Sequence, residues 1–369
     1  MGADVVVVYT PVGGGHKAAA LAIAEAARVR GLSVELLDLF AWAPGIVGAT
    51  YLTAHLGGTM MTPNFYGMGY FAANRRNGAL EPLRRGFDHV AFGGLVKRVC
   101  EERPRAVIAT HHLPLVVLGR ARRMGRLDAR LTGVITDYTA HACWAEPGVD
   151  AFCVPCPLAE RELAGHGVSR DIITETGIPV RPAFDAIAPV RNPASGEPLR
   201  VLLTSGSFGV GPTDRIVRSF HGVPNVELTV VCGSARGAVE RVTRVAAEAG
   251  VRARVLGFER DMPSRVAEAH LVVGKAGGLT VSESMAAGRP MILVGTVPGN
   301  ELSNAWMVGA AGAGVAAMPA DVGAAAHAIR SRGELEVMGQ RAAGLVHRAT
   351  ADAVIDVALA STEESREAA

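Results

Sequence analysis

The chain has 369 residues, of which 49% are hydrophobic and 20% charged, and its formal net charge is +2. This composition excludes a disordered chain, and so small a net charge gives no reason to expect a nucleic-acid partner. The length exceeds that of one hydrophobic core and predicts two domains. The five cysteines, an odd and sparse set, are typical of a reducing cytoplasm.

Neither a leader peptide nor a membrane span is expected. Met1 comes shortly before an apolar run at residues 5–9, without the basic segment and long apolar stretch of a signal peptide. No uninterrupted apolar run reaches the about 18 residues that cross a bilayer. Residues 75–130 contain 13 Lys and Arg against 5 Asp and Glu, an excess of 8 positive charges. This basic stretch either meets anionic lipid headgroups or forms solvated helix faces.

The first half of the chain alternates short apolar strands with helices. An alanine-rich helix is predicted over residues 16–31, ending at Gly31. Strands are predicted at residues 4–10, 33–39, 104–111, 130–138 and 150–155. Strands that alternate with helices predict parallel βαβ units in an open, doubly wound sheet.

A proline-rich stretch without periodicity follows at residues 181–198 and predicts a linker. The strand pattern then restarts at residues 199–207, 226–233, 253–258, 270–278 and 290–295. We expect a last helix near residues 334–360 and a charged tail. The predicted organisation is an N-terminal domain over 1–183, a linker over 184–198, a C-terminal domain over 199–345, and a C-terminal helix and tail over 346–369. Two such Rossmann-like domains are expected to face a deep cleft at the carboxyl ends of their strands.

Gly13, Gly14 and Gly15 lie between the first strand and the first helix. Glycine lets a ligand approach the backbone, and the N-terminus of the helix attracts an oxyanion or a polarised hydroxyl. His16 follows directly. The helix dipole disfavours its cationic form, so His16 is a candidate general base. A capping or buried histidine is the alternative.

The same turn also fits a dinucleotide-binding fingerprint. Gly13, Gly15 and Ala18 have the required spacing, and Asp38 lies about 20 residues further on. An oxidoreductase that binds NAD is therefore an alternative, although it does not account for His16.

Two glycine turns occur in the second half. One is TSGSFGVG at residues 204–211, and the other is GKAGGLTVSE at residues 274–283. In the second turn, backbone N–H groups and the Thr280 hydroxyl suit a diphosphate. Glu283 lies one helical turn further, where its carboxylate suits a ribose diol. A capping role is the alternative for Glu283.

Cysteines and aromatic residues suggest further sites. Cys153 and Cys156 form a CxxC pair, and together with His141 and Cys143 they resemble a zinc set, but the spacing matches no common module. We expect Cys156 to replace a helix N-cap residue. Residues 50–71 are rich in Tyr, Phe and Met, which favours either a membrane-facing segment or a packed helix pair. Nearby arginines favour the membrane interpretation: Arg75, Arg76, Arg84 and Arg85.

The stretch GKAGGLTVSESMAAGRPMILVGTVPGNELSNA resembles the nucleotide-sugar-binding signature of glycosyltransferase family 28. The resemblance is closest to the branch of monogalactosyldiacylglycerol synthases and processive diacylglycerol glucosyltransferases. PVGGGHKAAALAI, THHLPL, TDYTAHACWAEPGVDAFCVP and GIPVRPAF resemble the N-terminal blocks of that branch in the same order. GSFGVG, VVCG and LGF resemble its early C-terminal blocks.

This resemblance implies a GT-B fold with a UDP-sugar held by the C-terminal domain. It implies a lipid acceptor, commonly diacylglycerol, held by the N-terminal domain of an enzyme that is peripheral on the cytoplasmic face of a membrane. It also implies inversion at the anomeric carbon. No Asp-x-Asp motif occurs, so we expect no metal or other cofactor, and helix N-termini would neutralise the leaving UDP.

Residue roles carry over from the matching motifs. His16, Asp137 and His141 are the candidates for the general base, and the choice between them stays open. Gly14, Gly15, Tyr66 and Trp144 are expected on the acceptor side. The donor residues are expected to be Gly206, Ser207, Phe208, Gly233, Phe258, Gly277, Gly278, Thr280, Glu283, Pro298, Gly299, Asn300 and Glu301.

Among the donor residues, the two glycine turns would approach the diphosphate, Phe258 would pack near the uracil, and Glu283 would hold the ribose. Residues 298–301 would reach the sugar hydroxyls. The family often has Gln where Asn300 stands, and this shorter amide leaves the identity of the donor sugar open.

The resulting hypothesis is an inverting, metal-independent transferase that moves a hexose from UDP-galactose or UDP-glucose to diacylglycerol at an anionic membrane surface. The alternatives are transfer to a polyprenyl-diphosphate intermediate, a UDP-sugar epimerase, an NAD oxidoreductase and a UDP-sugar sensor without turnover. The oligomeric state is left open.

Overall fold

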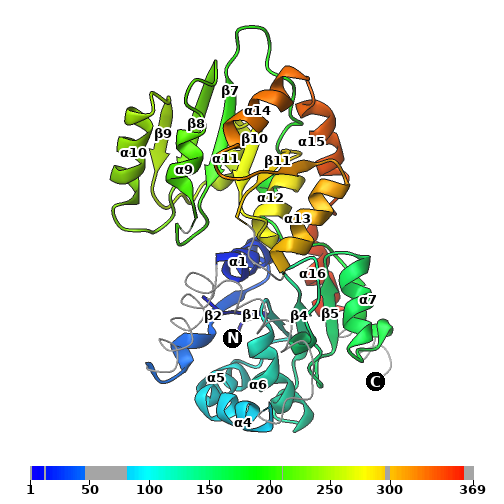
Figure 1. The fold of residues 1–369 in the computed structure, drawn as a ribbon. Coiled ribbons are helices and arrows are strands. Elements are labelled where there is room, and N and C mark those ends of the chain that lie inside the picture. Colours follow the sequence, from blue (N-terminus) through cyan, green and yellow to red (C-terminus); the bar gives the residue numbers. More distant parts are fainter. Residues whose placement is uncertain (1, 12–13, 46–80, 210, 296–299, 361–369) are drawn as a thin grey trace. The chain divides into compact units, whose positions relative to one another are not determined.

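The computed structural model describes residues 2–11, 14–45, 81–209, 211–295 and 300–360. The chain divides into two compact units (Figure 1). Unit 1 comprises the chain up to Pro182 and again from Ala349 onward, and unit 2 comprises Ala183–Arg348. The C-terminal part of the chain therefore belongs to unit 1.

The described strands of unit 1 form a parallel sheet in the order β2-β1-β3-β4-β5-β6. They are β1 Val5–Tyr9, β2 Val34–Asp38, β3 Ala106–Ala109, β4 Arg130–Val134, β5 Ala151–Val154 and β6 Ile173–Glu175. The direction of the strand order changes between β1 and β3, and ligands of such sheets bind beyond the carboxyl ends of the strands at this point.

Helices cover both faces of this sheet. They are α1 Gly14–Val29, α4 Glu81–Ala91, α5 Gly93–Glu102, α6 His112–Arg123, α7 Pro157–Gly165 and α16 Thr350–Leu359. The buried side chains of Val5 and Val7 pack with α1 and α16, whereas those of Val6 and Val8 pack with α5 and α6. Burial on both faces explains why β1 is a continuous run of β-branched residues rather than an alternating one. Figure 1 shows α16 beside β4 and β5, which it contacts.

Unit 2 repeats this architecture, with strand order β12-β11-β10-β7-β8-β9. Its strands are β7 Leu199–Thr204, β8 Val226–Val231, β9 Ala253–Leu256, β10 Leu271–Gly274, β11 Met291–Leu293 and β12 Gly314–Ala316. Its helices are α9 Thr213–Arg218, α10 Ala238–Glu248, α11 Met262–Glu268, α12 Gly278–Ala286, α13 Asn300–Ala310, α14 Val322–Ser331 and α15 Leu335–Ala343. The neighbours β7 and β10 mark the point where its strand order changes direction.

The sequence patterns correspond to most of these elements, and the exceptions have physical causes. The patterns do not predict β6 and β12, because both are three-residue edge strands with largely exposed side chains. The single helix expected near residues 334–360 is wrong, because α15 and α16 are separate. Ala349, before α16, has φ of 51°, a left-handed conformation that interrupts a helix.

The segment that follows α8 (Pro182–Asp185) is tied to unit 2 by Arg289. This arginine is 4% exposed, and its guanidinium donates to the carbonyl of Ala188 at 2.9 Å and to that of Ala269 at 2.7 Å. Burial is the main reason why its pKa falls to about 10. The part of the predicted linker around Ala188 is therefore packed rather than free.

His270, just before β10, makes the stability of unit 2 sensitive to pH. It is 7% exposed, and the Arg200 backbone N–H donates to its Nδ1 at 3.1 Å. Burial, assisted by Arg200, lowers the pKa of His270 to about 4, whereas an unfolded chain has a value near 6.5. The unfolded chain therefore takes up a proton first as the pH falls. The stabilisation is complete above pH 6.5 and is lost progressively toward pH 4.

We expect the free energy of unfolding of unit 2 to fall by about 2 kcal/mol between pH 7.5 and 4.5 because of His270. This figure is below the full value of the shift, because solvent screening offsets part of it. Hydrogen exchange of the β7 and β10 amides measures it. His270→Asn keeps an acceptor for the Arg200 N–H and should flatten the pH dependence, whereas His327→Asn, at an exposed position of α14, should not. An unchanged slope in His270→Asn would contradict the assignment.

Candidate active site

Four aromatic side chains gather at the carboxyl end of the unit 1 sheet, and we call them the histidine cluster: His16, His111, His112 and Trp144. His16 lies in the first turn of α1, and His111 and His112 begin α6 directly after β3. Trp144 ends the 3-10 helix Ala142–Trp144. The His16 and His111 rings meet edge to face with centroids 4.6 Å apart, and His112 and Trp144 do so at 6.1 Å.

His16 is anchored by the ends of two neighbouring strands. Its Nδ1 lies 2.8 Å from the carbonyl oxygen of Thr110, which follows β3, and 2.9 Å from Oγ1 of Thr136, which follows β4. The Thr110 hydroxyl also donates to the His16 carbonyl at 2.8 Å. A carbonyl oxygen can only accept, so Nδ1 carries the proton of the neutral ring. The basic lone pair of His16 is therefore at Nε2.

His111 and His141 have the opposite arrangement. Nδ1 of His111 accepts from the Leu113 N–H, and Nδ1 of His141 accepts from the Cys143 N–H, each at 3.1 Å. Each caps a helix start, so its neutral ring carries the proton on Nε2 and uses its lone pair at Nδ1. These two histidines therefore have capping roles at α6 and at the 3-10 helix Ala142–Trp144, whereas Nδ1 of His16 faces two strand ends. Among these three rings, His16 has the tautomer that suits a general base at Nε2.

The other predicted N-terminal residues lie near the cluster in the chain. Asp137 directly follows Thr136 and is partly exposed. His141 is 7% exposed, and Trp144 is 6% exposed. Gly14 and Gly15 are the first residues of α1 rather than part of the turn before it. Thr110, Thr136, His111 and His112 are not among the predicted site residues, although two histidines after a buried strand are a usable signal.

Asp38, the acid of the dinucleotide-binding alternative, has another role here. Its Oδ1 accepts from the Phe40 N–H at 2.9 Å and caps the 3-10 helix Leu39–Trp42. One of the two oxygens of this carboxylate therefore has a structural role.

In unit 2, the loops after β7 and β8 touch through their glycines. Gly233 has φ of 65°, and a Cβ there would lie 2.3 Å from the Gly206 carbonyl oxygen and 2.7 Å from that of Ser207. The Ser234 N–H donates to the Ser207 carbonyl at 2.9 Å. We call Gly206, Ser207 and Gly233 the glycine cradle. At Gly233 both the conformation and the space require glycine.

The loop after β9 lies beside this cradle. A Cβ on Gly257 would lie 4.0 Å from the Gly233 carbonyl oxygen. Phe258 follows, and its side chain is 61% exposed. Phe208, between the cradle residues and Gly209, is partly buried. An exposed aromatic ring beside a glycine loop is available to stack on a base.

Gly277 is the N-cap residue of α12, after β10. A Cβ at Gly277 would have no atom within 4 Å, so a ligand has space to approach the helix N-terminus. The first turn of α12 contains no acidic residue, and its unpaired backbone N–H groups favour an anion. Gly278 is buried, whereas Thr280 and Glu283 are partly exposed, three residues apart on one side of the helix.

The start of α13 contacts the turn between β10 and α12 through two side-chain interactions. Lys275 Nζ lies 3.3 Å from Glu301 Oε1, and the buried Asn304 donates from Nδ2 to the Ala276 carbonyl at 2.8 Å. Lys275 is a cation directly after β10 that is not among the predicted site residues. Its position before the glycine turn is the signal that identifies it.

Several predicted residues lie outside the described part of the chain. The aromatic segment 50–71 belongs to this group, and so do the side chains of Arg84, Arg85 and Asn300. The remaining ones are Gly13, Tyr66, Arg75, Arg76, Pro298 and Gly299.

The cysteines of the CxxC pair have structural positions. Cys153 is fully buried in β5, and burial raises its pKa to about 12, so it stays a thiol. Cys156 is the N-cap residue of α7, as predicted, and makes no side-chain capping bond. Within the described ranges, no three His, Cys, Asp or Glu side chains are grouped so as to hold a metal ion. No helix in those ranges has the length and apolar character to cross a bilayer.

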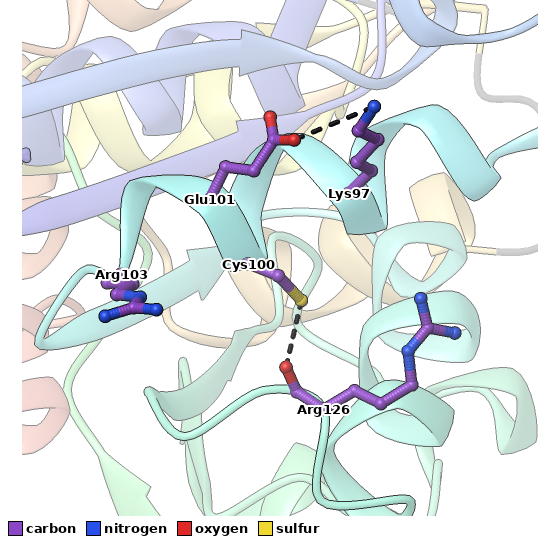
Figure 2. Close-up of a pocket in the computed structure, with 5 residues that line it drawn as sticks. All are labelled: Lys97, Cys100, Glu101, Arg103 and Arg126. Atoms are coloured by element: carbon purple, nitrogen blue, oxygen red, sulfur yellow. Dashed lines mark hydrogen bonds and ion pairs between the residues drawn. The ribbon is translucent and has the colours of Figure 1, made fainter.

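A groove of about 700 Å³ lies elsewhere in unit 1, and Figure 2 shows the side chains that line it. It is lined by Lys97, Cys100, Glu101, Arg103 and Arg126. Cys100 Sγ donates to the Arg126 carbonyl at 3.1 Å, and burial raises the pKa of this thiol. Arg103 and Arg126 precede β3 and β4, so the groove lies at the amino ends of the strands. Because ligands of these sheets bind at the carboxyl ends, we place the groove outside the candidate site.

Two family models match the chain. The monogalactosyldiacylglycerol synthase model matches residues 16–180, and the glycosyltransferase family 28 C-terminal domain model matches residues 203–317. A curated relative, the processive diacylglycerol beta-glucosyltransferase of Staphylococcus carnosus, is 27% identical over 226 residues. That match covers 59% of this chain and 57% of the relative, so the chain spans little more than half the length of this relative.

Two solved structures have the same architecture. MurG of Acinetobacter baumannii superposes with a TM-score of 0.65 at 17% identity, covering 96% of this chain and 98% of that one. HepE of Anabaena, in complex with UDP and glucose, has a TM-score of 0.57 at 15% identity, with both chains fully covered. At these identities the likeness shows the fold alone, and it confirms the predicted two-domain α/β fold of the GT-B type.

Proposed function

We propose that this chain transfers a hexose from a UDP-sugar to a lipid hydroxyl. Its residues 16–180 belong to the monogalactosyldiacylglycerol synthase family, and its residues 203–317 form a glycosyltransferase family 28 C-terminal domain. Diacylglycerol is the proposed acceptor, and UDP-glucose or UDP-galactose the proposed donor. The observation that carries the proposal is the tautomer of His16. Its Nδ1 is committed to the Thr110 carbonyl, so Nε2 can take the proton of an attacking hydroxyl.

In the proposed reaction, the acceptor oxygen attacks the anomeric carbon while Nε2 of His16 removes the hydroxyl proton. The bond between that carbon and the diphosphate oxygen breaks, and the configuration inverts. His16 becomes an imidazolium whose Nδ1–H keeps its bond to the Thr110 carbonyl. Asp137 and His141 remain the alternative bases, but the Nδ1 lone pair of His141 already accepts from the Cys143 N–H.

The donor is proposed to bind to unit 2. The N–H groups at the start of α12 and the glycine cradle would hold the diphosphate, and their dipoles would stabilise the negative charge of the leaving UDP without a metal ion. Phe258 would lie near the uracil and Glu283 would accept from the ribose hydroxyls. Glu301, held by Lys275 at 3.3 Å, would face the sugar with the neighbouring residues 298–300.

We propose a cytoplasmic enzyme that is peripheral on the inner face of the cell membrane. Support comes from the excess of basic residues between positions 75 and 130 and from two exposed apolar side chains of α4. Phe87 is 52% exposed and Val90 85% exposed. Such side chains beside basic residues suit an anionic lipid surface.

The deciding experiment is UDP release from the purified protein, measured separately with UDP-glucose and UDP-galactose. Each donor is tested with and without diacylglycerol, in anionic and in neutral liposomes, and with EDTA. Release that requires diacylglycerol and survives EDTA supports the metal-independent lipid transferase and identifies the donor.

Other outcomes assign the alternatives. Interconversion of UDP-sugars without lipid would indicate an epimerase, and release only with a polyprenyl-diphosphate intermediate would change the acceptor. Binding of UDP without turnover in any mixture would indicate a sensor. Binding of NADH, and not of UDP, would support the alternative that the protein is an oxidoreductase.

A second prediction concerns Glu283. If its carboxylate accepts from the ribose, Glu283→Ala should weaken UDP binding roughly tenfold or more, because a hydrogen bond to a charged group is lost. Titration calorimetry with UDP and with 2′-deoxy-UDP measures it. The deoxy analogue should bind the wild type more weakly than UDP does, and it should lose less affinity than UDP in Glu283→Ala, since one of the two ribose contacts is already absent. Glu336→Ala, at an exposed position of α15, is the control. Additive losses would exclude the ribose contact.

A further inference from the structure

The ring of His16 has two oxygen neighbours on the same nitrogen. The Thr110 carbonyl lies 2.8 Å from Nδ1, and Oγ1 of Thr136 lies 2.9 Å from it. Thr110 is fully buried and Thr136 is 4% exposed, so neither oxygen is readily replaced by solvent. Because β3 and β4 are paired neighbours, with Ala109 opposite Gly133, their ends hold the ring from one side.

From this geometry we infer that Thr136 is a positioning residue for His16, a role that rests on the proposed function. The carbonyl of Thr110 fixes the proton on Nδ1. The hydroxyl of Thr136 is a second acceptor for that N–H, and it turns the ring so that Nε2 faces away from the strand ends. The sequence predicts Asp137 as a candidate base, whereas the structure places the hydroxyl of its neighbour Thr136 at Nδ1 of His16.

The second acceptor matters most when the ring becomes charged. A hydrogen bond donated by an imidazolium is stronger than one donated by a neutral ring. The Thr136 hydroxyl therefore stabilises the state in which His16 has taken the acceptor proton more than it stabilises the resting state. An interaction that strengthens in the transition state raises kcat and leaves substrate binding unchanged.

The test compares Thr136→Val with Thr136→Ser. Valine keeps the shape but removes the hydroxyl, and we expect kcat to fall about tenfold, with KM for donor and lipid unchanged. Serine keeps the hydroxyl and should restore most of kcat. Both variants retain the charged and titratable neighbours His111, Asp137 and Lys17, so the comparison isolates the hydroxyl.

A matched control is available on β4, the strand that Thr136 follows. Thr132 is fully buried in β4, and its hydroxyl has no hydrogen-bond partner within the described part of the chain. Thr132→Val makes the same chemical change away from His16 and should leave kcat unchanged. If Thr132→Val and Thr136→Val lose activity equally, the effect is general to the strand and the inference fails.

Nitrogen-15 NMR of the histidine rings tests the geometry without any substrate. The signals of His16 are identified by their absence in His16→Gln. We expect the Nδ1–H tautomer in the wild type, and a weaker Nδ1–H hydrogen bond in Thr136→Val but not in Thr136→Ser or Thr132→Val. An Nε2–H tautomer in the wild type would overturn the inference. A protein with the expected tautomer and no lipid glycosylation would instead overturn the proposed function.

Discussion

Replacing His16 with glutamine should lower kcat for sugar transfer by about a hundredfold or more, the usual contribution of a general base. Glutamine can still donate to the Thr110 carbonyl, which now lies 2.8 Å from Nδ1, but it has no basic nitrogen. UDP binding should be unchanged, because the proposed donor contacts all belong to unit 2. Steady-state rates with a fixed liposome composition, together with UDP calorimetry, measure both effects.

Two further histidine variants make this result specific. His327→Gln changes an exposed residue of α14 and should retain full turnover. His141→Gln should lower kcat less than His16→Gln does, because Nδ1 of His141 accepts a hydrogen bond from the Cys143 N–H at 3.1 Å and is not available as a base. Full turnover in His16→Gln would move the role of the base to Asp137 or His141.

Gly233→Ala should reduce kcat/KM for the UDP-sugar by about a hundredfold, the effect expected when binding groups shift by about 1 Å. Its Cβ would lie 2.3 Å from the Gly206 carbonyl oxygen, so the loop after β7 must move. Backbone oxygens and nitrogens line this contact, and they cannot rotate away as a side chain can.

The control for this variant is Gly250→Ala. Gly250 has φ of 63°, close to the 65° of Gly233, but a Cβ there would meet no atom within 4 Å. Both variants carry the same backbone strain, of roughly 1–2 kcal/mol, so Gly250→Ala shows the effect of that strain without the collision that Gly233→Ala adds. Only Gly233→Ala should lose affinity for UDP in calorimetry. Equal UDP affinity in the two variants would show that the glycine cradle does not contribute to donor binding.

Much of the fold follows from local sequence patterns. The run Val5–Val8 predicts a strand that is buried on both faces, and the glycine turns predict where strands end and helices begin. The strand order is not local information, and the short edge strands β6 and β12 have no pattern of their own. The break before α16 depends on the conformation of Ala349, a residue type that ordinarily favours a helix.

The candidate site is predicted in part for a similar reason. His16 and Gly233 can be identified in the sequence because each lies in or beside a glycine turn that follows an apolar strand. Thr110 and Thr136 cannot be identified in this way, since a threonine after a strand is ordinary. Only the pairing of β3 with β4 brings both residues to the ring of His16. The tautomers of His16 and His141 differ because of backbone groups, which no residue type reveals.

The return of α16 to unit 1 has a consequence for biosynthesis. Residues 350–359 of this helix cover Val5, Val7 and Ile23, which leave the ribosome early, yet the helix itself is made after all of unit 2. At typical translation rates, the intervening chain takes on the order of ten seconds to synthesise. Throughout that interval one face of the first sheet lacks its final covering helix. The N-terminal unit therefore matures after the C-terminal one, and a nascent-chain chaperone has an apolar surface to protect in the meantime.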